Sequence, residues 1–137
     1  MQRMMQIHAV ASYLQDLAPL LRASENVQAD IIHVGDFVSG CGSSKHIADA
    51  VSKAAQDNLT LLLVAKLAPK IKVNSIFPAL MLFNPTDTVQ FRKKALDKSL
   101  MRCGAGFDEF QHSVDYLLAS GDVSGWILSL DDGRHLV

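Results

Sequence analysis

The chain has 137 residues, 49% of them hydrophobic and 20% charged, and its 13 basic and 14 acidic side chains leave a formal net charge of -1. These proportions exclude disordered and fibrous proteins and indicate one globular domain. The balanced charge creates no field that would attract nucleic acid or an anionic membrane, so neither partner is expected. The densest basic cluster is typical of a solvated helix face and comprises Arg92, Lys93, Lys94 and Lys98.

The cysteine content and the length of the apolar runs indicate the redox compartment of the protein and whether it contains a metal site or a membrane span. Cys41 and Cys103 are too few for a disulfide framework and lack metal-ligand spacing, so we expect no metal site and a reducing, cytoplasmic location. The longest apolar run, residues 59–68, is interrupted by Thr60 and Lys66. It is shorter than the roughly 18 residues that a membrane span requires, and no span is predicted.

The first predicted elements are a helix and a short strand. Apolar residues spaced by three and four predict a helix over 4–21 with two apolar faces, which Pro19 should bend or shorten. A strand of the buried type follows at 31–34. Residues 35–44 are rich in glycine and serine and predict a loop, in which Ser43 or Ser44 could cap the next helix.

The longest predicted helix covers residues 46–67 and ends before Pro69. Its apolar residues are separated from a polar stripe formed by Asp49, Lys53, Asp57 and Thr60. An alternating strand is predicted over 70–76, and it places Lys72 and Asn74 on the face opposite Ile71 and Val73.

The last part of the chain completes an alternating order of helices and strands. It comprises an apolar-rich loop at 78–87, helices at about 88–100 and 108–120, and a strand at 126–130. Strands that alternate with helices imply parallel pairing through right-handed crossovers and therefore an α/β fold. With only three strands, the strand at 31–34 should form an open edge where a neighbour is expected.

Spacing alone leaves two interpretations of the candidate site residues. Asp36 follows a strand, and α/β sheets place their ligands at strand ends. Asp49 and Lys53 are four residues apart on a helix, so their side chains can meet. Such a pair is far more often a surface ion pair that contributes about 0.3–0.5 kcal/mol.

A longer pattern favours a functional site. It consists of SSKHIADAVSKAA at 43–55, LAP at 67–69 and VNSIFP at 73–78. Together these segments resemble the active-site helix and the following strand of the short-chain dehydrogenase/reductase family. Further segments extend the resemblance over essentially the whole chain and point to the pterin- and dihydrofolate-reducing members: DIIH at 30–33, LFN at 82–84, KSLM at 98–101, VDYLL at 114–118 and DGRHL at 132–136.

The resemblance implies the C-terminal part of a Rossmann-like, doubly wound parallel sheet of about three strands with flanking helices. Residues 1–137 would form a single incomplete domain without the N-terminal nucleotide-binding half. The glycine pairs at 40–42 and 104–106 lack the context of a strand followed by a helix that a dinucleotide-binding turn requires. The family uses NADPH, and Lys53, Pro78 and Ala79 match positions beside the nicotinamide and its ribose, but binding by this chain should be poor.

The resemblance also assigns catalytic roles. In the family a tyrosine donates a proton, a lysine assists it, and in pterin reducers an aspartate replaces the usual serine. Asp36 matches that aspartate and Lys53 the lysine, whereas Asp49 stands at the tyrosine position. A carboxylate beside an ammonium is held in its charged form and has no proton to donate at neutral pH. We therefore expect a truncated, degenerate relative of an NADPH-dependent pterin reductase that is inactive alone.

Two other hypotheses remain. In the family, the helices that match 4–21 and 46–67 pack against a symmetry mate as a four-helix bundle, and here both carry apolar residues on more than one side. The alternative is therefore a noncatalytic oligomerisation module that pairs with itself or with a full-length reductase. The third hypothesis is a weak reductase in which Asp36 supplies the proton through water.

Overall fold

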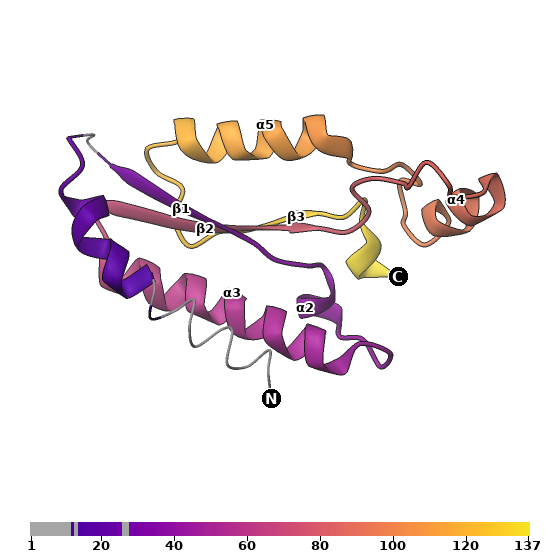
Figure 1. The fold of residues 1–137 in the computed structure, drawn as a ribbon, viewed down its shortest axis with the longest axis horizontal. Helices are drawn as coiled ribbons and strands as arrows, with labels where there is room; N and C mark the ends of the chain where they lie inside the picture. The colour runs from indigo at the N-terminus through magenta and orange to yellow at the C-terminus, as the bar shows by residue number, and fades with distance from the viewer. Residues whose placement is uncertain (1–11, 13, 26–27) are drawn as a thin grey trace.

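The protein is described by a computed structural model that covers residues 12, 14–25 and 28–137. A three-stranded sheet forms the middle layer, with α3 (Ile47–Leu67) on one face and α5 (Gly106–Ala119) on the other (Figure 1). The strands are β1 (Ala29–Val34), β2 (Ile71–Pro78) and β3 (Ile127–Leu130). The predicted α/β fold with three parallel strands and flanking helices is confirmed.

The sheet has the order β1-β2-β3 and both of its pairings are parallel. Val34 lies opposite Ile76 and Pro78 lies opposite Leu130, so the carboxyl ends of all three strands point to the same side. Because β2 is central and covered on both faces, all of its residues from 71 to 77 are buried. Among the described residues β1 pairs with β2 alone, which leaves the open edge that the sequence predicts.

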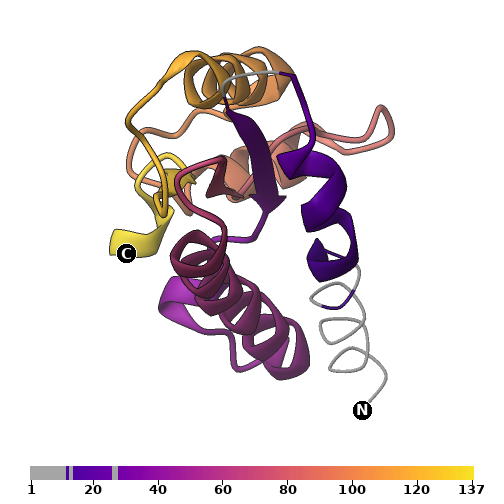
Figure 2. The same cartoon turned by 90° about the vertical axis from the view of Figure 1, so that its left-hand side faces the viewer.

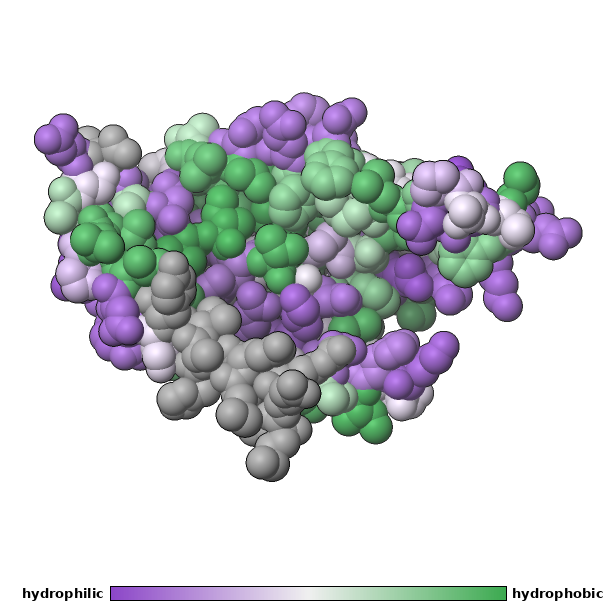
Figure 3. All heavy atoms as spheres, viewed as in Figure 1, coloured by the Kyte–Doolittle hydropathy of each residue, from purple (hydrophilic) through white to green (hydrophobic). Residues whose placement is uncertain are grey.

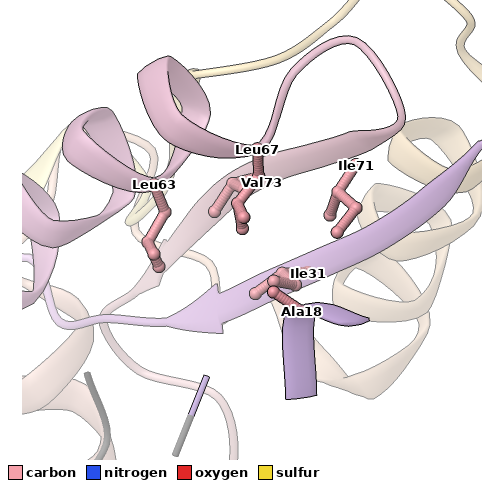
Figure 4. Packing of buried hydrophobic residues seen from close by; sticks show 6 residues of the cluster. All are labelled: Ala18, Ile31, Leu63, Leu67, Ile71 and Val73. Carbon is pink, nitrogen blue, oxygen red and sulfur yellow. The ribbon is translucent and has the colours of Figure 1, made fainter. Parts of the chain in front are cut away.

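The hydrophobic core lies between the sheet and α3. Leu63 and Leu67 project from successive turns of α3 onto Ile31, Ile71 and Val73 of the strands, and Ala18 closes the cluster (Figure 4). Ala18 belongs to a helical segment at 14–22, which runs beside β1 on the same face as α3 (Figure 2). Most of the remainder of the helix predicted at 4–21 falls outside the described residues.

On the other face of the sheet, a buried ion pair fixes α5. The Lys72 ammonium lies 3.1 Å from the Asp30 carboxylate and donates to the carbonyl oxygens of Leu117, at 2.8 Å, and of Ser120. The last carbonyls of a helix carry partial negative charge, so the buried ammonium stabilises the end of α5. Next to it, the buried Asn74 amide donates to the Val123 carbonyl and accepts from the Trp126 amide, which guides the chain into β3.

Most element boundaries agree with the sequence analysis, and three predictions need correction. The loop at 35–44 contains a short helix, α2 (Val38–Cys41). The predicted serine cap of α3 is wrong: His46 is the N-cap, and the Ser43 hydroxyl instead accepts from the His46 amide at 3.1 Å. Helix α4 (Val89–Leu96) ends before the predicted residue 100, since the chain turns there and the Met101 amide bonds to the Asp132 carbonyl at 3.1 Å.

No helix in the described part of the chain is long and apolar enough to cross a membrane. Likewise, the described residues contain no group of three or more His, Cys, Asp or Glu side chains that could hold a metal ion.

Candidate functional site

The candidate site lies where β1 and β2 end side by side. The Gly35 amide donates to the Ile76 carbonyl at 2.8 Å and so extends the pairing of the two strands by one residue. A Cβ atom at position 35 would stand only 2.6 Å from the ring of Phe77, so glycine permits the close approach of this turn to the sheet. The next residue is Asp36, which the sheet thereby delivers to its carboxyl end.

Local hydrogen bonds fold the chain back after Asp36. Its carboxylate Oδ1 accepts from the Val38 amide at 3.0 Å, and its carbonyl accepts from the Ser39 hydroxyl at 2.9 Å. An aspartate that bonds the backbone two residues on is typical of a turn, and here it leads directly into α2. The Asp36 side chain is half-buried.

Lys53 joins α3 to the same strand end. Its ammonium donates to the carbonyl of Val34, the last residue of β1, at 3.0 Å. Asp49 lies one turn earlier, in the first turn of α3, and is half-buried. Pro78 ends β2, and the Ala79 amide continues the pairing with β3 by donating to the Leu130 carbonyl at 3.2 Å.

The five residues singled out from the sequence therefore come from the carboxyl ends of two adjacent strands and from the first two turns of α3. Asp36 and Lys53 approach the same strand end, β1, and Pro78 and Ala79 stand at the end of β2. The sheet brings these positions together although they are up to 43 residues apart in the chain.

Asp57, one turn after Lys53, was not singled out from the sequence as a site residue. Burial raises the pKa of Asp57 to about 6, against the opposing effects of a hydrogen bond with Ser39 and of the positive charge on Lys53. Its Oδ1 atom is buried and has no hydrogen-bond partner among the described residues. The only sequence signal for it is its place on the polar stripe of α3.

A buried polar pair continues this stripe. His33 Nδ1 lies 2.7 Å from the Thr60 hydroxyl, which also donates to the Gln56 carbonyl at 3.2 Å. A hydroxyl has one proton, so Thr60 accepts from His33 Nδ1 when it donates to the Gln56 carbonyl, and it donates to Nδ1 in the other tautomer of the ring. Burial lowers the pKa of His33, which keeps the ring neutral. The polar stripe of α3 thus faces β1 and α2.

A cavity of about 700 Å³ opens beside the candidate site, at the carboxyl end of β3. Its wall is formed by the chain before α5, the first turn of α5 and the C-terminal turn, including Cys103, Asp108, Glu109, Asp132 and His135. None of Asp36, Asp49, Lys53, Pro78 and Ala79 lines it.

The turn after β1 does not fit the pyrophosphate of a dinucleotide. Such a group requires free backbone amides at the start of a helix. In the turn after β1 the amides of Ser39, Gly40 and Gly42 already bond to the carbonyls of Asp36, Phe37 and Val38. This turn therefore offers no cradle for a pyrophosphate.

Comparisons with known proteins now place the chain in a family. It is 52% identical to dihydromonapterin reductase of Escherichia coli strain 536 over 135 residues, which are 97% of this chain but 56% of that protein. The chain therefore corresponds to part of a short-chain dehydrogenase/reductase. It spans little more than half the length of the curated relatives that it matches. No family model matches it.

Solved structures of short-chain dehydrogenases/reductases share the fold. FolM alternative dihydrofolate reductase 1 from Brucella canis, complexed with NADP, superposes with a TM-score of 0.80 at 23% identity over 91% of this chain and 49% of that protein. A short-chain type dehydrogenase/reductase from Mycobacterium ulcerans gives a TM-score of 0.71 at 18% identity over 80% of this chain and 42% of that protein. The sequence match and the structural matches therefore each cover about half of the related protein.

Proposed function

We propose that this chain is the substrate-site half of an NADPH-dependent pterin reductase scaffold and that it does not reduce a pterin by itself. The observation that carries the proposal is Asp49, which stands where the resemblance expects a tyrosine, one turn before the lysine. A carboxylate close to an ammonium has no proton to give at neutral pH, whereas a phenol does. The Lys53 ammonium donates to the Val34 carbonyl and so lies beside the strand end, as an assisting lysine would.

Asp36 is the remaining candidate for the proton donor. It is half-buried at the end of β1, and one of its carboxylate oxygens already accepts a backbone hydrogen bond. Asp36 is therefore better suited to orient a polar substrate than to protonate it, and weak activity would require a water molecule to carry the proton.

NADPH is the cofactor that the family resemblance implies, with Lys53, Pro78 and Ala79 beside its nicotinamide end. When bound, NADPH supplies the hydride. Because the amides after β1 are already engaged within the α2 turn, we expect this chain to bind NADPH poorly. The exposed, unpaired thiols of Cys41 and Cys103 are consistent with a reducing cytoplasm as its location.

The decisive experiment is NADPH binding by calorimetry on the purified chain, beside a mass determination by size-exclusion chromatography with light scattering. The expected result is no binding at micromolar NADPH by a folded sample. Micromolar binding would contradict the incomplete cofactor site. In that case, dihydropterin turnover should be measured in Asp49→Tyr, with Asp49→Phe as the matched control that lacks the phenolic hydroxyl. A gain in Asp49→Tyr alone would assign the missing proton donor to this position.

A second function is supported by the outer face of α3, which we propose as the surface for pairing with a second copy of this chain or with a full-length reductase. Ile47, Val51, Leu61 and Leu62 line this face and are 66%, 53%, 50% and 61% exposed. Their spacing places them on one stripe along most of the helix. Exposed apolar stripes of this length mark protein interfaces.

The pairing surface can be tested with two lysine substitutions of equally exposed leucines. Leu62 on α3 and Leu82 in the loop after β2 are both 61% exposed. Leu62→Lys should lower the mass measured in solution from that of a dimer to that of a monomer, because it places a charge within the apolar stripe. Leu82→Lys should leave the mass unchanged. Equal masses for wild type and Leu62→Lys would contradict the pairing proposal.

A further inference from the structure

The C-terminal turn is built on a buried carboxylate at the end of β3. Asp131 is 5% exposed, and its Oδ2 accepts from the His135 amide at 2.9 Å and lies 2.7 Å from His135 Nδ1. Its carbonyl accepts from the Arg134 amide at 2.8 Å. Both ends of the turn are thus held by one residue, which fixes the direction in which the 3-10 helix η1 (Arg134–Leu136) leaves the sheet.

The backbone at Asp132 and Gly133, inside this turn, is also restricted by its dihedral angles and its neighbours. Asp132 and Gly133 both have a positive φ, at 56° and 72°, and a Cβ at Gly133 would approach the Leu100 side chain to 3.2–3.3 Å. The Met101 amide, next to Leu100 in the chain, bonds to the Asp132 carbonyl at 3.1 Å. The start of η1 is therefore held by the segment before α5 as well as by Asp131.

This turn presents Arg134 to the loop that carries Asp36. The Arg134 guanidinium lies over the Phe37 ring, 4.7 Å from its centroid. Figure 1 shows the yellow C-terminal turn beside α2, although the two segments are almost 100 residues apart. Phe37 directly follows Asp36 and is the N-cap residue of α2, so a contact with its ring bears on the position of Asp36.

We propose that Arg134 is a positioning residue for Asp36: the C-terminal turn holds Phe37 through its guanidinium and so orders the loop that ends β1. The functional meaning of this inference rests on the role proposed above for Asp36, but the contact itself does not depend on that role. It would make the C-terminal turn part of the substrate site, because the end of β3 fixes a residue at the end of β1.

Amide hydrogen exchange measured by NMR tests the inference on the full chain. The informative amides are those of Ser39, Gly40 and Gly42, which bond within the α2 turn. In Arg134→Met, which keeps the aliphatic bulk and loses the charge, these amides should exchange about two- to fivefold faster. Arg134→Lys keeps a cation over the ring and should restore rates close to those of wild type. The Asp36 carboxyl carbon signal should shift in Arg134→Met and return in Arg134→Lys.

Arg92 provides a matched control, because its guanidinium also lies over an aromatic ring, that of Phe83, at 5.2 Å. Arg92→Met should speed exchange of the Asp87 amide and leave the α2 amides and the Asp36 signal unchanged. Unchanged α2 exchange in Arg134→Met, or equal acceleration of the Ser75 amide in the central strand, would overturn the proposal. If Arg134→Met does not fold, Phe37→Leu provides the same test from the other partner. None of these measurements uses NADPH or pterin, so they do not depend on the reductase assignment.

Discussion

The two faces of α3 differ from those of an ordinary amphipathic helix packed on a sheet. Toward β1 and α2 the helix presents Lys53, Asp57 and Thr60, and Thr60 is completely buried. On the outer face it presents an apolar stripe whose four large side chains are at least half exposed. The inner side of α3 combines these polar residues with the apolar Leu63 and Leu67, which pack on the strands.

This difference shows which face of α3 finds its interaction partners within the same chain. The inner polar groups find partners within the chain: Lys53 reaches the Val34 carbonyl and Thr60 pairs with His33. The outer apolar stripe has no such match among the described residues, and exposed apolar area of this kind is stabilised only by a second surface. A second exposed apolar area lies below α5 (Figure 3). Val34, on the edge strand β1, is 48% exposed.

The largest expected effect comes from two neighbouring leucines on opposite faces of α3. Leu63 is 2% exposed and Leu62 is 61% exposed. Leu63→Ala should lower the free energy of unfolding by about 3 kcal/mol, because it removes packed volume from the core. Leu62→Ala should change it by less than about 0.5 kcal/mol in the monomer. Urea denaturation at low protein concentration measures both values. Equal losses would show that the two faces are not distinct.

A smaller effect is expected from the buried hydroxyl on the inner face. Thr60→Val keeps the side-chain shape but removes the partner of His33 Nδ1, 2.7 Å away. A buried polar group left without its hydrogen-bond partner costs about 1–3 kcal/mol, so the free energy of unfolding should fall by that amount. Urea denaturation of Thr60→Ser is the control, since serine retains the hydroxyl. A stability of Thr60→Val equal to that of wild type would mean that the inner face does not depend on this pair.

The smallest expected effect is a pH dependence that arises from Asp57. Burial raises the pKa of this carboxyl from 3.8 to about 6, so the folded state favours the protonated form. Its stabilising contribution is complete below the unfolded value of 3.8 and is lost as the pH rises through about 6. Asp57→Asn cannot ionise. It should therefore be more stable than wild type by about 1 kcal/mol at about pH 8, and this gain should shrink as the pH falls below about 6.

Urea denaturation across this pH range measures the gain for Asp57→Asn. The exposed Asp122 provides a control for the loss of one negative charge, and Asp122→Asn should show no comparable gain. A constant difference between Asp57→Asn and wild type at every pH would contradict the raised pKa of Asp57.

The sequence identifies the fold because its signals are local. Periodicity and Pro69 place α3 within one residue of its observed bounds, and the alternating run predicts β2 together with its two distinct faces. The predicted bounds of helix α4 and of the loop before α3 were less accurate. Their limits depend on contacts that no local pattern shows, such as the Met101 amide that bonds across to Asp132.

The candidate site was predictable in part for the same reason. Asp36 and Lys53 are recognisable because one follows a strand and the other lies in the segment that resembles the family's active-site helix. Asp57 was visible only as a member of a polar stripe, and its burial depends on how α2 folds over α3. Arg134 carries no local signal for its contact with Phe37, which is far away in the chain.

By itself, the amino-acid sequence determined that the described part of the chain has three parallel strands with helices on both faces and is related to part of a short-chain dehydrogenase/reductase. Hydrophobic spacing and short motifs depend on neighbours within a few residues, so they can be read from the chain alone. Only the tertiary structure decided that the polar stripe of α3 faces inward beside Leu63 and Leu67, while a second apolar stripe of the helix stays exposed. It also decided that the C-terminal turn reaches Phe37. The orientation of a helix and the meeting of distant segments follow from the packing of the whole sheet, which no local pattern encodes.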